Sequence, residues 1–244
     1  MMSARIRCRH GCLFLLLICS NFTWAQSVSV TANVALVNKG KKNAPPASNV
    51  VLWLSPVGGL TVPTAPPDPT LPKPRLVQKN KSFEPHVLVV PVGALVEFPN
   101  RDPFFHNVFS LFEGKRFDLG LYEAGSTRDV LFDKPGISYI FCNIHAEMSA
   151  VVIALNTPYY GISNHQGQVT IAHVPPGRYM LRVWYEAALP ELLNSMTQEV
   201  TISATASSLG LMRLPASGLS ETHKNMYGGE YAPPTPGNPA YAHP

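Results

Sequence analysis

One short segment of the chain, residues 142–148, carries three side chains that bind soft metal ions: Cys142, His145 and Met148. A thiolate, an imidazole and a thioether form a donor set that favours copper over hard cations. The segment is too short to supply a complete site, so a second imidazole is expected from another part of the chain.

Cys142 is also the one cysteine that we expect in the exported protein. The other three, Cys8, Cys12 and Cys19, lie in a segment with the features of a removable export signal. A lone thiol in an oxidising compartment has no internal partner for a disulfide, so its purpose is expected to be chemical.

The export signal is predicted to span residues 1–25. It has a basic start, a short apolar run over residues 13–18, and small residues at Thr23 and Ala25 for cleavage before Gln26. The apolar run is well below the ~20 residues of a membrane span. We therefore expect a periplasmic or secreted protein without stable membrane insertion; the alternative is an uncleaved N-terminal anchor.

The overall charge gives no reason to expect binding to nucleic acid. The formal net charge is +4, but three of the arginines lie in the predicted signal, and only 14% of residues are charged. The sequence also lacks paired carboxylates in a recognisable frame, a Gly-rich phosphate loop and a nucleophile elbow. An enzyme is therefore not expected.

Short alternating stretches between frequent Pro and Gly residues predict an all-β chain. One stretch, residues 187–194, suits a short helix or a loop. We expect one β-sandwich within residues 26–155, where it follows an N-terminal extension, and a second, smaller β-sandwich over residues 156–215. Residues 26–60 pack either on the first sandwich or on the second. Residues 216–244 have little to bury and are predicted to be a disordered tail. The tail's tyrosines Tyr227, Tyr231 and Tyr241 either dock on a partner or stay solvated.

The second imidazole is assigned to His106. It follows a predicted strand over residues 94–98 and stands beside another that starts at Asn107, so it can meet Cys142 at one end of a sandwich. His106, Cys142 and His145 would then be the strong ligands of a single type 1, or blue, copper ion, with Met148 as a weak axial ligand. The alternatives are a structural role for His106, and a buried Cys142 and core Met148 beside an incidental His145.

Three neighbours are expected to surround these ligands. The Asn107 side chain would bridge the two ligand-bearing loops by hydrogen bonds. Phe105 and Ile144, together with Phe104, would form an apolar wall that excludes water from the site.

Residues 75–155 resemble the cupredoxins, the plastocyanin and amicyanin family, and in particular those described as methylamine utilisation proteins. Outside the ligands the resemblance rests on Phe83, Pro85, Gly93, Phe98, Asn100, Phe105, Asn107, Gly125, Gly136 and Tyr139. It implies a Greek-key β-sandwich with copper on His106, Cys142, His145 and Met148. The loop departs from many members in having Asn143 and Ala146 where proline is common.

A second resemblance covers residues 156–214, which look like the carboxypeptidase regulatory-like, transthyretin-like sandwich. It rests on Gly167 and on the turn over residues 174–179. The pattern fixes a turn and implies no chemistry of its own.

The cupredoxin resemblance implies a protein of electron transport, a monomer that carries single electrons between redox partner proteins in the periplasm. A copper carrier that captures Cu(I) and hands it on would use the same ligands. A structural or adhesion module with a vestigial site is the third interpretation.

Overall fold

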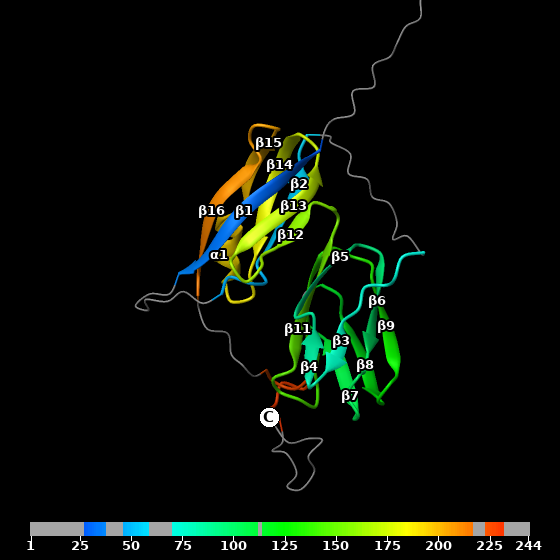
Figure 1. Ribbon diagram of the computed structural model, residues 1–244. Coiled ribbons are helices and arrows are strands. Elements are labelled where there is room, and N and C mark those ends of the chain that lie inside the picture. Colours follow the sequence, from blue (N-terminus) through cyan, green and yellow to red (C-terminus); the bar gives the residue numbers. More distant parts are fainter. Residues whose placement is uncertain (1–26, 38–45, 59–69, 112–113, 217–222, 232–244) are drawn as a thin grey trace, which may run out of the picture.

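The computed structural model of the chain describes residues 27–37, 46–58, 70–111, 114–216 and 223–231. Within these residues it contains sixteen β-strands and one short helix, so the predicted all-β class is confirmed. The strands form two β-sandwiches, each around its own hydrophobic core (Figure 1). The predicted export signal lies outside the described residues. Among the described helices, none combines the length and apolar character that crossing a membrane requires.

The first sandwich carries the predicted copper ligands. Its larger sheet has the strand order β5-β11-β10-β7-β8, and the facing layer contains the pairs β6-β9 and β3-β4. After passing through β8 and β9 the chain returns as β10 beside β7, a Greek-key arrangement. The strands are β3 (Val77–Lys79), β4 (Ser82–Glu84), β5 (Val87–Pro91), β6 (Ala94–Pro99), β7 (His106–Ser110), β8 (Phe117–Tyr122), β9 (Thr127–Phe132), β10 (Gly136–Cys142) and β11 (Ser149–Leu155).

The second sandwich has two sheets, of order β13-β1-β16 and β12-β2-β14-β15. Its helix is one of the two outcomes expected near residues 187–194. The elements are β1 (Val28–Val37), β2 (Val51–Pro56), β12 (Tyr160–Ile162), β13 (Gln168–Val174), β14 (Gly177–Trp184), α1 (Pro190–Ser195), β15 (Gln198–Ile202) and β16 (Ser208–Pro215).

The predicted grouping of residues 26–155 into one unit is therefore wrong at its N-terminal end. Strand β1 is the middle strand of a sheet of the second sandwich, and β2 lies between β12 and β14. The physical reason is that Val30, Val34 and Leu36 on β1 fill the core of the second sandwich. Without β1, strands β13 and β16 would have no neighbour to pair with.

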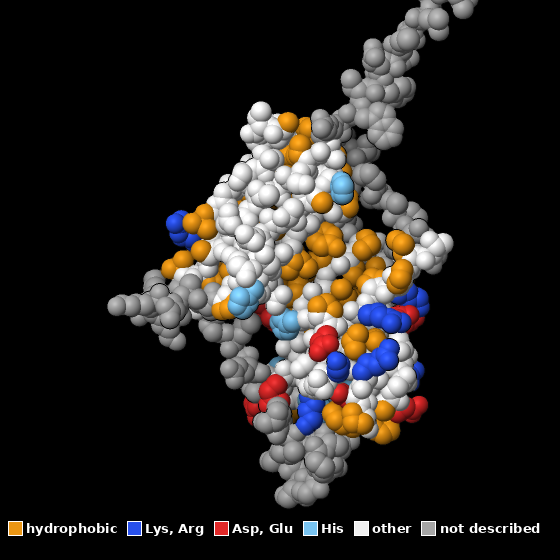
Figure 2. Space-filling model, in the orientation of Figure 1, with side chains coloured by type: hydrophobic (Ala, Val, Ile, Leu, Met, Phe, Trp, Pro, Cys, Tyr) orange, Lys and Arg blue, Asp and Glu red, His pale blue; other side chains and the backbone are white. Residues whose placement is uncertain are grey.

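The two sandwiches meet through a third apolar cluster. Strand β11 is buried on both faces: Val152 faces the core of the first sandwich, whereas Val151 and Ile153 face Val51 and Trp184 of the second. Figure 2 shows hydrophobic side chains gathered where the two sandwiches meet. The period-2 alternation of a strand explains how one element serves two cores.

The predicted disorder of residues 216–244 is wrong for the described part of that segment. Residues 223–231 lie against the loop that follows β10, and hydrogen bonds join the two. Residues 217–222 and 232–244, including Tyr241, lie outside the described residues.

Candidate metal centre

Antiparallel pairing brings the predicted ligands to one end of the first sandwich. His106 is the first residue of β7, and Cys142 is the last residue of β10. The two strands are neighbours, with Cys142 paired to Val108. One further hydrogen bond, from Asn143 N to Asn107 O at 2.8 Å, extends this pairing into the ligand loop, which we define as residues 142–148.

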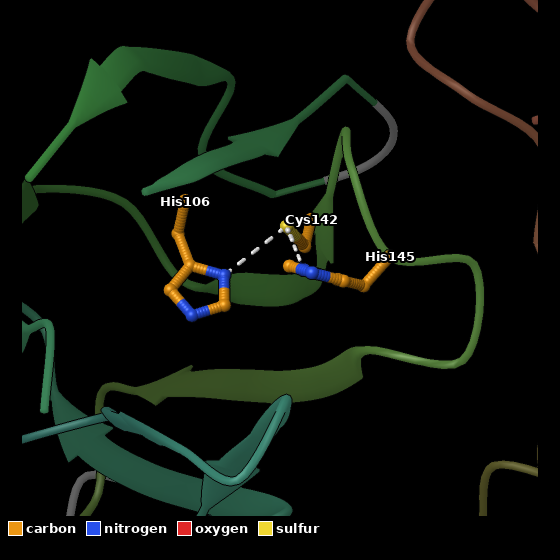
Figure 3. A group of neighbouring side chains, drawn as sticks. All are labelled: His106, Cys142 and His145. Carbon is orange, nitrogen blue, oxygen red and sulfur yellow. Dashed lines mark hydrogen bonds between the residues drawn. The ribbon is translucent and has the colours of Figure 1, made fainter. Parts of the chain in front are cut away.

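The structure gathers His106, Cys142 and His145 around one point (Figure 3). Cys142 Sγ lies 3.5 Å from His106 Nδ1 and 3.6 Å from His145 Nδ1. The three ligand atoms all lie within 4.8 Å of one another. A tetrahedral ion with ordinary metal–sulfur and metal–nitrogen bond lengths separates its sulfur and nitrogen ligands by about 3.6 Å. The spacing of these atoms therefore fits a metal ion between them.

The three side chains are removed from water. Cys142 and His106 are fully buried and His145 is 2% exposed. The Phe104 ring lies 5.4 Å from the His106 ring and 5.5 Å from the His145 ring, centroid to centroid. A metal ion held here would have an apolar, water-poor surrounding.

Met148 ends the ligand loop and is fully buried within the core of the first sandwich. Its backbone closes the loop, because Cys142 N donates to Met148 O at 3.1 Å and Met148 N donates to His145 O at 3.2 Å. These bonds hold the methionine at the same end of the sandwich as the three gathered ligands.

A buried carboxylate orients His106. Asp102 Oδ2 lies 2.9 Å from His106 Nε2, and the Asp102 side chain also accepts backbone hydrogen bonds from Asn80 at 2.6 Å and Lys81 at 3.0 Å. Both amides belong to the β3–β4 turn, where Asn80 and Lys81 have positive φ angles of 55° and 56°. The Nε2–H group of His106 thus donates to Asp102, which leaves the Nδ1 lone pair for a metal.

The electrostatics of this pair favour a neutral imidazole beside an ionised carboxylate. Burial lowers the pKa of His106, against the opposing effect of Asp102. Burial alone would raise the pKa of Asp102, but hydrogen bonds from the Lys81 amide, His106 and the Asn80 amide bring that pKa below its usual value. A neutral histidine is the form that can bind a metal.

Cys142 is held as a thiol until a metal binds. Burial raises the pKa of Cys142, and backbone N–H groups of Asn107, Ile144 and His145 partly offset that effect. These amides stabilise a thiolate when one forms. Metal binding at this site is therefore expected to release the thiol proton.

Two of the residues predicted to surround the ligands, Asn107 and Phe105, have different roles from those expected. Asn107 does bridge the two ligand segments, but through its main chain; its side chain donates to Asp118 at 3.0 Å. Phe105 is 42% exposed, so Phe104 supplies the wall against the imidazoles. Ile144 is partly buried against the core of the first sandwich.

Comparison with known proteins gives matches among solved structures only. No model of a protein family matches the sequence, and no curated protein matches it either. A purple cupredoxin from Nitrosopumilus maritimus aligns at 22% identity over 34% of this chain and 100% of its own, with a TM-score of 0.32. A reduced amicyanin variant aligns at 21% identity over 34% of this chain and 82% of its own, also at 0.32.

A copper-containing nitrite reductase from Thermus scotoductus SA-01 aligns at 24% identity over 39% of this chain, with a TM-score of 0.34. The chain covers only 27% of that enzyme's length.

Proposed function

We propose that this chain is a type 1 copper protein that passes single electrons between redox partners. The observation that carries the proposal is the buried group of His106, Cys142 and His145, whose ligand atoms converge within 4.8 Å at one end of a β-sandwich. Copper, when bound, supplies a one-electron redox couple. Met148 is proposed as the weak axial ligand, since it closes the same loop.

The protein's own residues provide rigidity and exclusion of water. Strand pairing fixes Cys142 relative to β7, and Asp102 fixes the orientation of the His106 ring. Phe104 lies over both imidazoles. A site that is held in place from several sides reorganises little when its charge changes, which is the requirement for rapid electron transfer.

Burial of the ligands favours electron transfer over delivery of copper. A carrier has to expose its metal to an acceptor, whereas His106 and Cys142 are fully buried here.

We further propose that the protein works as a monomer in the periplasm or outside the cell, after removal of residues 1–25. Sequencing of the N-terminus of the exported protein tests the cleavage before Gln26.

The direct test is a visible and paramagnetic-resonance spectrum of the mature protein with one equivalent of Cu(II). We expect an intense thiolate-to-copper absorption that ascorbate removes and reoxidation restores. The Cys142→Ser variant should lack this absorption. Colourless copper-loaded wild type contradicts the proposal, and transfer of copper to an acceptor in place of reversible cycling supports a carrier.

A further inference from the structure

The described part of the C-terminal segment, residues 223–231, lies on the ligand loop. Strand β16 ends the second sandwich at Pro215, yet residues 223–231 contact the first sandwich beside the start of β11 (Figure 1). The chain therefore crosses back from the second sandwich to the candidate metal centre of the first.

Four hydrogen bonds attach this segment to the ligand loop. Tyr231 Oη donates to Cys142 O at 2.6 Å, and His223 Nε2 lies 3.2 Å from Met148 O. The backbone contributes two more, which are His223 N to Ala146 O at 3.1 Å and Met226 N to Asn143 Oδ1 at 2.8 Å. Two of the four carbonyl or amide acceptors thus belong to proposed copper ligands.

Ring contacts accompany these hydrogen bonds. The His223 ring lies against Phe141 of β10 at a centroid distance of 4.4 Å, tilted by 40°, and meets the Tyr231 ring edge-on at 5.4 Å. Tyr227, in the same segment, is 84% exposed.

The segment has an internal turn that holds its shape. Asn225 Oδ1 accepts from the amides of Tyr227 and Gly229, both at 3.0 Å, and Asn225 Nδ2 donates to Glu230 O at 3.1 Å. The turn sets the separation between His223 and Tyr231. Both residues therefore contact the loop from the two ends of one hydrogen-bonded turn.

We propose that residues 223–231 form a clasp on the ligand loop, in which Tyr231 and His223 are positioning residues for Cys142 and Met148. The effect of the clasp on copper binding rests on the proposed function, whereas the contact between residues 223–231 and the loop does not depend on a metal. The loop has no proline, and backbone hydrogen bonds from Cys142 N to Met148 O and from Met148 N to His145 O cross it. The clasp adds an external constraint on the loop, beside the hydrogen bond from Asn143 N to Asn107 O of β7.

The test compares Tyr231→Phe and His223→Phe with the matched control Tyr227→Phe in the full chain. Both test variants keep an aromatic ring, and each removes one side-chain hydrogen bond to the ligand loop. In the metal-free protein, amide hydrogen exchange of residues 143–148 should quicken by about fivefold, the factor expected for one lost neutral hydrogen bond. The Tyr227→Phe control should exchange at the wild-type rate.

In the Cu(I)-loaded protein, both test variants should lose copper to a chelator about fivefold faster than the wild type. In the oxidised, Cu(II)-loaded protein, the thiolate-to-copper band should shift in Tyr231→Phe but not in Tyr227→Phe. Wild-type exchange rates in both Tyr231→Phe and His223→Phe overturn the clasp. A wild-type chain that takes up no copper overturns the proposed function instead, while the exchange measurement still decides the clasp.

Discussion

At the scale of single residues, the candidate centre depends on side chains that do not themselves reach the metal. Asp102 holds the His106 ring through Nε2, and two amides of the β3–β4 turn hold Asp102. The resulting chain of contacts fixes which imidazole nitrogen is available to a metal. Partners of this kind commonly change metal affinity by about 10- to 100-fold.

Asp102→Asn is expected to weaken copper binding by about tenfold or more, because the His106 ring loses its charged acceptor. The reduction potential should rise, since a nearby negative charge that favours the oxidised metal is removed. Competition with a copper chelator and voltammetry measure the two effects. Asp133→Asn, at an exposed carboxylate that pairs with Lys115, is the control. Equal affinity in both variants would show that Asp102 does not support the site.

Met148→Leu is expected to keep copper and raise the reduction potential, because a weak axial donor to the oxidised metal is lost while the buried volume is nearly retained. Voltammetry of the copper-loaded variant measures the potential. A potential equal to that of the wild type would remove Met148 from the ligand set.

At the scale of elements, strand alternation was predictable from sequence, whereas strand partners were not. Strand β11 contains an uninterrupted apolar run over residues 150–155, and only a second sandwich packed on its outer face explains why both of its faces are apolar. The role of β1 depends on pairing with β13 and β16, more than 130 residues away, which no local pattern reveals.

The candidate site, like the strands, was predictable from the sequence only in part. His106 and Cys142 could be placed together because strand ends converge in sandwiches, and the structure gathers them with His145. Asp102 was missed because an acidic residue in a bend carries no periodic signal; its spacing of four residues from His106 was the only available clue. Tyr231 was missed because composition predicted a solvated tail.

Gly167 provides a test of the second sandwich. Its φ is +77°, and a Cβ atom there would meet Val34 O at 2.1 Å. Gly210 also has a positive φ, of +73°, but a Cβ atom there has no neighbour within 4 Å. Gly210→Ala should cost about 1–2 kcal/mol from the backbone conformation alone.

Gly167→Ala should cost roughly 1–3 kcal/mol more than Gly210→Ala, because β1 has to move away from the new methyl group. Urea unfolding of both variants measures the difference. Equal losses would mean that the close approach of residue 167 to β1 has no energetic weight.

At the scale of the whole molecule, an apolar cluster and the ion pair between His86 Nε2 and Glu186 Oε2, 2.6 Å apart, join the two sandwiches. His86 Nδ1 also lies 3.2 Å from Ser149 O, so both ring nitrogens face acceptors and the charged imidazolium suits the position. The hydrogen bond to Glu186 raises the pKa of His86 above its ordinary 6.5, against the effect of burial.

This shift predicts a pH dependence of the contact between the sandwiches. Because the folded-state pKa is raised, the stabilisation is fully present below about pH 6.5 and is lost as the pH rises through the folded-state pKa. The melting temperature should fall over that range in the wild type and change less in His86→Gln. Parallel curves for the two proteins would show that the pair does not contribute.

The order of strands has a consequence for the segment between β2 and β12. The chain departs from the second sandwich after β2 and rejoins it at β12, and these two strands are hydrogen-bonded neighbours, with Trp53 opposite Tyr160. The portion of the chain between β2 and β12, which carries the candidate metal centre, thus begins and ends at neighbouring strands of the second sandwich. Any other segment at this position would also have to cover Val51 and Trp184, which the metal-bearing sandwich buries in the third apolar cluster.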